Sequence, residues 1–165
     1  KVLNRRGFLA QLKRTLSSSK RTGVGGALVI LDLDRFKNIN DRHGHVAGDR
    51  LLQKVASSLK LKVRDSDTIG RLGGDEFAII LAGLPSSMIS NRIDEIQCAI
   101  NRLHFEWGNH KITVCASIGR YDYSGLETYT ELINLADLSM YDKKLKKNNE
   151  QQLVPTIRQP RISAL

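Results

Sequence analysis

Cysteine and aromatic side chains are both scarce in this 165-residue chain. The two cysteines, Cys98 and Cys115, stand in apolar contexts without a C-x-x-C spacing. We therefore expect buried thiols in a reducing compartment and a cytoplasmic domain. Aromatic residues make up 5% of the chain and are not interleaved with basic ones, which disfavours a nucleic-acid partner.

Long apolar runs are missing too. No run approaches the roughly 20 residues that a membrane-spanning helix needs, and the opening KVLNRRGFLAQLKR lacks the apolar stretch of a secretion signal. We expect no membrane contact by this domain itself, and membrane tethering of the parent protein stays open. A chain of this length, 41% hydrophobic, suits one compact domain that buries roughly 70% of its unfolded surface.

Glycine-rich phosphate motifs are also absent. The stretch TGVGG precedes a predicted strand instead of following one, and G-x-x-x-x-G-K-[ST] does not occur, which excludes a dinucleotide fingerprint and a P-loop. Acids are outnumbered, 17 against 26 Lys and Arg, giving a net charge of +9. A solvated helix end explains the basic cluster DKKLKK, but we favour an anionic phosphate ligand.

Apolar spacing predicts alternating helices and strands. The helical stripes are Leu9-Leu12-Leu16, Leu51-Leu52-Val55-Leu59 after Gly48, Ile89-Ile93-Ile96-Ile100, and a last helix over 126–147. The predicted strands are ALVIL at 27–31, a hairpin over 68–81 that turns at Gly73-Gly74, and KITVCASIGRYDY at 111–123. Because a hairpin makes its neighbours antiparallel, this order favours an α/β sandwich over a doubly wound parallel fold.

Two acids follow the strand ALVIL directly. Asp32 and Asp34 are two residues apart, so an extended backbone places both on one side, with Leu33 on the other. A carboxylate after five apolar residues is partly desolvated and needs a partner such as a divalent cation, although Asp34 has helix or turn capping as an alternative role. If the hairpin lies beside ALVIL, Asp75 at its tip meets Asp32 at one edge of the sheet. Magnesium is usually held by such oxygens together with phosphates.

Five blocks in order resemble the GGDEF domain, the catalytic domain of diguanylate cyclases: LNRRGF, LDLDRFKNINDRHGHVAGD, RLGGDEFAIIL, ASIG and ADLSMYDKKLKK. The resemblance covers residues 1–150, and we expect 151–165 to form a C-terminal tail. It implies an α/β fold (α+β sandwich) with a central, mostly antiparallel five-stranded sheet surrounded by helices, similar to nucleotidyl cyclases and the polymerase palm. It also implies condensation of two GTP into cyclic di-GMP and two pyrophosphates, by 3′-hydroxyl attack on the α-phosphate at a dimer of domains.

The resemblance implies a metal site and a catalytic pair. Asp32, the main-chain carbonyl of Leu33 and Asp75 match the magnesium positions, with manganese as the alternative ion. Asp75 is also the candidate that deprotonates the attacking hydroxyl, and Lys37 joins it as a catalytic residue. Glu76 alternates away from Asp75, so we expect it to be secondary, an exposed or salt-bridged strand residue.

GTP-binding positions follow from the same resemblance. Asn40 and Asp49 match the residues that read guanine, since an amide and a carboxylate pair with edges that adenine does not offer. The alternative structural role of Asn40 is that of a turn residue, and the alternative role of Asp49 is that of a residue at the start of a helix. Phe36 and Lys37 match the segment around the phosphates, with core packing as the alternative role of Phe36, and His45 matches a substrate contact.

The last block departs from the family pattern Y-x-A-K-x-x-G-R-N. Lys144 keeps the lysine that binds GTP, whereas Lys143, Lys147 and Asn148 replace alanine, glycine and arginine. Lys146 or Lys147 supplies charge in place of the arginine but lacks the bidentate fork of a guanidinium. We therefore expect weaker GTP binding with intact chemistry.

The stretch RDSD matches the family's inhibitory site, an R-x-x-D five residues before the glycine pair. There Arg64 would contact guanine or phosphate of bound cyclic di-GMP and Asp67 would accept from guanine. The alternative is an i,i+3 ion pair at a helix end.

Two other classes of function stay open. One is a regulatory module that binds GTP or cyclic di-GMP without turnover, and the other is a basic interaction domain for protein or nucleic acid. The upstream signal and any downstream phosphodiesterase domain are not readable from these residues.

Overall fold

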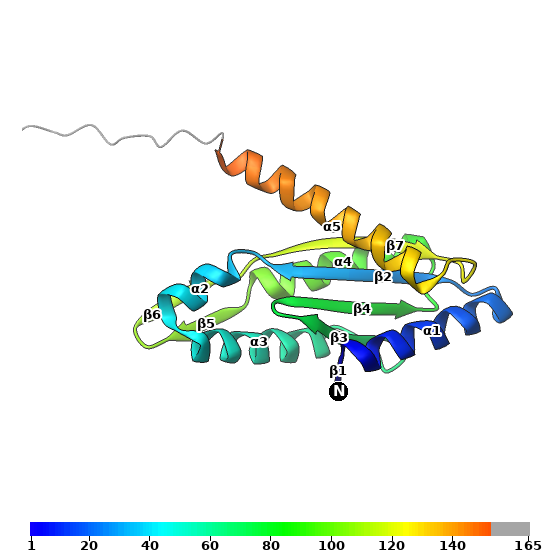
Figure 1. The fold of residues 1–165 in the computed structure, drawn as a ribbon, viewed down its shortest axis with the longest axis horizontal. Coiled ribbons are helices and arrows are strands. Elements are labelled where there is room, and N and C mark those ends of the chain that lie inside the picture. The colour runs from blue at the N-terminus through cyan, green and yellow to red at the C-terminus, as the bar shows by residue number, and fades with distance from the viewer. Residues whose placement is uncertain (153–165) are drawn as a thin grey trace, which may run out of the picture.

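The chain forms a five-stranded sheet in the order β1-β3-β4-β2-β7 and a separate two-stranded sheet, β5-β6; the computed structural model describes residues 1–152 (Figure 1). The strands are β1 (Val2–Asn4), β2 (Gly26–Leu33), β3 (Thr68–Gly73), β4 (Glu76–Ala82), β5 (His104–Trp107), β6 (His110–Thr113) and β7 (Ala116–Tyr123). The helices are α1 (Arg5–Thr22), α2 (Phe36–His43), α3 (His45–Lys60), α4 (Ser86–Asn101) and α5 (Tyr129–Gln152). In the large sheet β1 pairs in parallel with β3 and every other pair is antiparallel, which confirms the predicted sheet.

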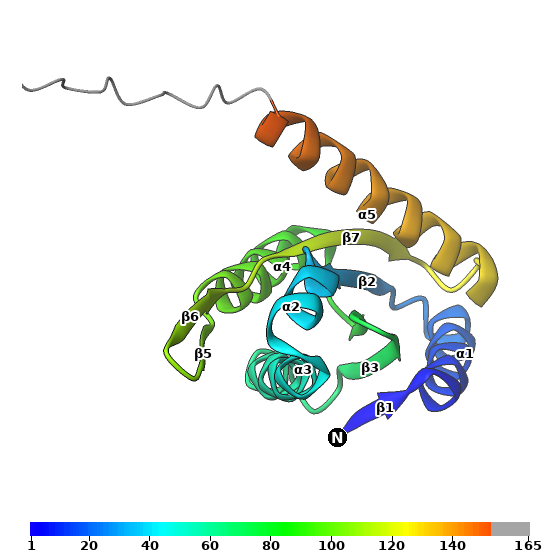
Figure 2. The same ribbon diagram turned by 60° about the vertical axis from the view of Figure 1, so that its left-hand side comes forward.

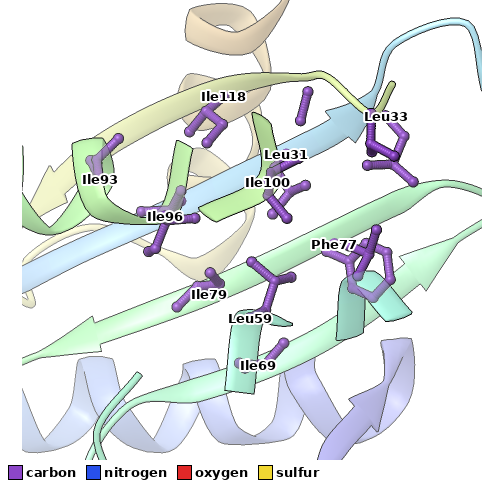
Figure 3. Packing of buried hydrophobic residues seen from close by; sticks show 14 of the residues in the cluster. Leu31, Leu33, Leu59, Ile69, Phe77, Ile79, Ile93, Ile96, Ile100 and Ile118 are labelled. Atoms are coloured by element: carbon purple, nitrogen blue, oxygen red, sulfur yellow. The ribbon is translucent and has the colours of Figure 1, made fainter. Parts of the chain in front are cut away.

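Helices cover both faces of the large sheet (Figure 2). The strand β2 is buried along its whole length because its side chains alternate between two cores. Val29, Leu31 and Leu33 pack with α3 and α4 in the larger core, part of which Figure 3 shows. Leu28 and Ile30 pack with α1 and α5 in the smaller one. Burying each such side chain stabilises the fold by about 1.5–3 kcal/mol.

Gly119 allows α5 to lie directly on β7. A Cβ at this position would lie 2.3 Å from the carbonyl oxygen of Ala136, so any larger residue would push the helix away. The helix also has a defined start, because Thr128 Oγ1 accepts the N–H of Glu131 at 3.2 Å and Glu131 Oε2 accepts the N–H of Thr128 at 2.9 Å. From this start α5 runs across the sheet (Figure 1). Lys144 and Lys147 in its later turns contact Asp32 and Asp34 at the end of β2.

Some predicted boundaries are wrong. The strand predicted over 111–123 is divided into β6 and β7, and at the break the N–H of Asp34 donates to the Cys115 carbonyl at 2.9 Å. The second predicted helix begins at His45, before Gly48, and the short α2 precedes it. The three-residue β1 was not predicted, because it is too short for its alternation to be recognised.

The tail predicted over 151–165 lies outside the described residues, except for the last two residues of α5. Within residues 1–152, no helix combines the length and the apolar character needed to cross a membrane.

Candidate active site

The tip of the β3-β4 hairpin lies beside the end of β2. Asp32 on β2 is directly opposite Glu76 on β4, and the N–H of Leu33 donates to the carbonyl of Asp75 at 3.4 Å. Gly74 has a φ of 46°, the left-handed conformation that the tight turn requires. The structure therefore brings Asp32 and Asp75 to the same edge of the sheet.

Glu76 is closer to this site than its expected secondary role suggested. Directly opposite residues of an antiparallel pair share a face of the sheet, so Glu76 lies on the face of Asp32. Both carboxylates line a pocket of about 810 Å³ together with Asp137 and Lys144 of α5. Alternation from Asp75 was misleading because Asp75 belongs to the turn and not to the strand.

Burial and mutual repulsion make two of these acids weaker. The pKa of Asp75 is raised, first by burial and then by the charge of Asp32, although Lys144 and Arg71 oppose the shift. The pKa of Glu76 is raised by burial and by the neighbouring Asp137, Asp32 and Asp75. The site thus concentrates negative charge at one point of a protein with a net charge of +9.

Lys144 is the cation that faces this cluster. Its Nζ donates to Asp32 Oδ1 at 2.6 Å. Burial alone would lower the pKa of Lys144, but the hydrogen bond to Asp32 and the charges of Asp32, Asp75 and Asp34 raise it overall. The predicted phosphate-binding lysine is therefore charged and is held at a predicted metal ligand.

A parallel contact lies next to it. Asp34 accepts a hydrogen bond from Ser117 Oγ at 2.7 Å and forms an ion pair with Lys147. Capping was the wrong alternative for Asp34, because Arg35 is the N-cap residue of α2 and the Asp34 carboxylate faces β7 and α5. Ser117 was not predicted as a site residue, because its only signal was its place in the ASIG block.

The segment predicted to surround the phosphates begins α2. Arg35 has a φ of 58°, a conformation that non-glycine residues rarely adopt and that is typical of functional sites. Phe36 packs in the core, as its alternative role predicted, while Lys37 is exposed. The first N–H groups of a helix have no partner within the helix, so this helix start is suited to an anion.

The positions predicted to read guanine lie where α2 meets α3. Asn40 Oδ1 is buried and has no hydrogen-bond partner among the described residues. It lies over Gly48, where a Cβ would be only 1.9 Å from this oxygen. Asp49 and His45 are exposed and four residues apart on α3, which places them on one face of the helix. A buried acceptor of this kind is uncommon and is available to a donor group of a ligand.

The stretch RDSD forms a turn instead of the i,i+3 ion pair named as its alternative role. Asp67 is buried; its Oδ2 accepts the backbone N–H of Arg64 at 2.9 Å and its Oδ1 accepts that of Ala82 at 3.2 Å. Arg64 is exposed. The aspartate thus connects the turn to the end of β4 and leaves the arginine side chain on the surface.

The donors at the hairpin suit a divalent cation that is completed by a ligand. Across residues 1–152, no three His, Cys, Asp or Glu side chains are grouped closely enough to hold a metal ion alone. Two carboxylates and a carbonyl oxygen, completed by phosphate oxygens, are nevertheless a common arrangement for magnesium. Burial first, and then repulsion between neighbouring acids, raises the pKa of Asp75 and of Glu76, and a bound cation would offset that repulsion.

Comparison with known proteins agrees with this geometry. The family model described as "Diguanylate cyclase, GGDEF domain" matches residues 1–150. The chain belongs to the GGDEF domain family. Diguanylate cyclase DosC of Escherichia coli K12 is 34% identical over 154 residues, which cover 93% of this chain and 34% of DosC. This GGDEF domain therefore spans about a third of that relative's length.

Solved structures agree as well. The GGDEF domain of PA1120 (YfiN or TpbB) from Pseudomonas aeruginosa is similar with a TM-score of 0.81 and 34% identity, covering 88% of this chain and 92% of that one. The coiled coil and GGDEF domain of DgcB from Caulobacter crescentus, in complex with c-di-GMP, has a TM-score of 0.82 and 25% identity, covering 88% and 78%. These similarities confirm the predicted family and fold.

Proposed function

We propose that this GGDEF domain condenses two GTP molecules into cyclic di-GMP and two pyrophosphates, as a diguanylate cyclase. The observation that carries the proposal is the meeting of Asp32 at the end of β2 with Asp75 and Glu76 of the hairpin, opposite Lys144. Acids beside a helix start and a charged lysine fit phosphoryl transfer, in which catalysis depends on positioning and charge stabilisation.

Each side chain has a role in this reaction. Asp75 accepts the proton of the 3′-hydroxyl, since its carboxylate lies at the tip of the hairpin beside Asp32. The oxygen then forms a bond to the α-phosphorus of the second GTP, and the bond to the β-phosphate breaks so that pyrophosphate leaves. Because each domain offers one such site, the reaction needs two domains facing each other.

Nucleotide binding is assigned to α2, α3 and α5. Asn40 Oδ1 accepts from a guanine N–H, and Asp49 and His45 contact the same nucleotide from α3. The start of α2 at Phe36, with Lys37 and Lys144, neutralises the phosphates. A divalent cation, when held by Asp32, the carbonyl of Leu33 and Asp75, supplies further neutralisation of phosphate charge; magnesium is our first candidate and manganese the second.

Product inhibition is the second part of the proposal. The DgcB relative was crystallised with c-di-GMP, which supports binding of the same product here. The exposed side chain of Arg64 is free to contact it, whereas Asp67 already accepts two backbone N–H groups. The GTP substrate also favours a cytoplasmic location for the domain.

A binding module without turnover is the alternative function. The observation that favours it is the ion pairing of Lys144 and Lys147 with Asp32 and Asp34, which occupies cations expected to bind phosphate. The replacement of the family's arginine by Asn148 acts in the same direction.

Product analysis with GTP and magnesium at high domain concentration tests both functions. We expect cyclic di-GMP and pyrophosphate from the unmodified chain, no product from Asp75→Ala, and normal product from Asp94→Ala, an exposed acid on α4. Equal product from both variants would contradict the role of Asp75. GTP binding with no product at any concentration would establish the binding module.

A further inference from the structure

A second cleft lies on the other side of α2 from the guanine-reading residues. It has a volume of about 910 Å³ and separates α2 from β6, with the last turns of α5 at one end. From α2 it is lined by Asn38, Ile39, Arg42 and His43, whereas Asn40 packs against Gly48 of α3. Residues 38, 39, 42 and 43 recur at helical spacing, so α2 presents one face to this cleft and another to the predicted purine.

The cleft is strongly basic. Arg42 projects from α2 and Lys111 from β6, and in the described part of the chain neither side chain makes a hydrogen bond or ion pair. Lys147 and Lys144 line the α5 end, where they are paired with Asp34 and Asp32. The acid that lines the cleft, Asp34, is already engaged by Ser117 and Lys147. Unpaired cations on two walls therefore face one concave space.

A histidine ring contact joins the two walls, and an isoleucine of each wall packs against the larger core. The rings of His43 on α2 and His110 on β6 have centroids 5.2 Å apart and planes inclined at 54°. Ile39 and Ile112 line the same cleft from the same two elements. These contacts give the cleft defined walls, unlike a row of independently solvated cations on a convex surface.

We propose that this cleft binds a diphosphate group. A diphosphate carries several negative charges over a short length. It can therefore contact a guanidinium and an ammonium on opposite walls at the same time, which a ligand with a single carboxylate does less well. The diphosphate arrives either as inorganic pyrophosphate or as part of a nucleotide. Its role rests on the proposed function: pyrophosphate released near Lys144 would pass Lys147 and reach Arg42 and Lys111 in the cleft.

Calorimetric titration of inorganic pyrophosphate into the full chain tests the site. The domain is first saturated with a GTP analogue that carries a methylene bridge between the α- and β-phosphorus atoms, so that the nucleotide site is filled. We expect pyrophosphate still to bind, and Arg42→Gln/Lys111→Gln to weaken it at least about tenfold, or about 1.4 kcal/mol. The matched control Arg14→Gln/Lys60→Gln removes the same charge from exposed positions on α1 and α3 and should leave the affinity unchanged.

The experiment distinguishes a failure of the pyrophosphate-site proposal from a failure of the proposed cyclase function. Asp75→Ala should keep the pyrophosphate affinity, because Asp75 does not line the cleft, so a failed cyclase assay leaves this result intact. Competition by GDP would identify a nucleotide diphosphate as a second source of the ligand. Equal affinity in the double glutamine variant and its control, or no pyrophosphate binding once the analogue is bound, would overturn the proposal.

Discussion

Lys144 Nζ donates to Asp32 Oδ1 at 2.6 Å, joining two residues that are 112 positions apart in the chain. One helical turn later, Lys147 makes the equivalent contact with Asp34. Helix α5 is thereby attached to the end of β2 by two acids, of which Asp32 lies opposite the hairpin residue Glu76. A cation bound by Asp32 would compete with Lys144 for this carboxylate, and a phosphate would compete with the carboxylates for the two lysines.

Asp32→Asn should reduce cyclic di-GMP formation at least about 100-fold, which corresponds to about 2.7 kcal/mol of transition-state stabilisation. The substitution removes a charge from a predicted metal ligand and the charged partner of Lys144. Initial rates measured over a range of magnesium concentrations check this prediction. An unchanged rate, or a loss equal to that of the surface variant Asp94→Asn, would contradict it.

Asp75→Asn should raise the melting temperature at neutral pH, although it removes the proposed base. The folded-state pKa of Asp75 is raised, so the folded protein binds this proton more tightly than the unfolded chain. Its contribution to stability therefore falls as pH rises from the ordinary value of 3.8 through the raised pKa. The stabilisation by asparagine should be larger at pH 7 than at pH 3.5, as measured by calorimetric melting. The same gain at both pH values would exclude the charge explanation.

Gly48→Ala should weaken GTP binding about tenfold while the sheet stays folded. The added methyl group would lie 1.9 Å from Asn40 Oδ1 and 3.0 Å from Phe36 Cζ, so the Asn40 side chain must move. Titration with GTP and ATP is the measurement, with Asn40→Ala as the comparison. We expect both variants to lose the preference for GTP, and a preference kept by both would remove Asn40 from the guanine site.

Lys147→Ala should raise the KM for GTP roughly three- to tenfold with little change in kcat, as expected when a charged contact to bound phosphate is lost. Lys146→Ala is the matched control, since Lys146 is exposed on the same turn of α5. Steady-state kinetics of the two variants give the comparison. Identical KM values for Lys147→Ala and Lys146→Ala would exclude a contact between Lys147 and the phosphates, and would leave only its ion pair with Asp34.

Arg64→Ala should relieve inhibition by cyclic di-GMP without destabilising the domain, because its side chain is exposed. Asp67→Ala is a poor test of the same site. It leaves the N–H groups of Arg64 and Ala82 without their acceptor and should cost about 1–3 kcal/mol of folding free energy. Initial rates with and without added product check the first effect, and chemical denaturation checks the second. Inhibition that persists in Arg64→Ala would exclude the proposed inhibitory site.

The local sequence pattern predicted the structure correctly where a residue type strongly prefers one environment or backbone conformation. Five apolar residues predicted the buried β2, and two glycines predicted the hairpin turn that presents Asp75. Glu76 was placed away from the acidic site because alternation was counted from a turn residue, whereas it lies opposite Asp32. The break between β6 and β7 was not predicted, because the mixed polar and apolar pattern of residues 111–123 continues across it without a turn signal.

The sequence by itself determined the family, the order of the main elements and the acids at the end of β2 and at the hairpin, since these follow from periods of two to four residues and from short motifs. Only the tertiary structure decided that Glu76 faces Asp32, that Lys144 and Lys147 reach Asp32 and Asp34, and that Arg42 and Lys111 share a cleft. Such contacts depend on strand register and on where a helix crosses a sheet. Register is set by packing over the whole domain, and no local stretch of residues contains it.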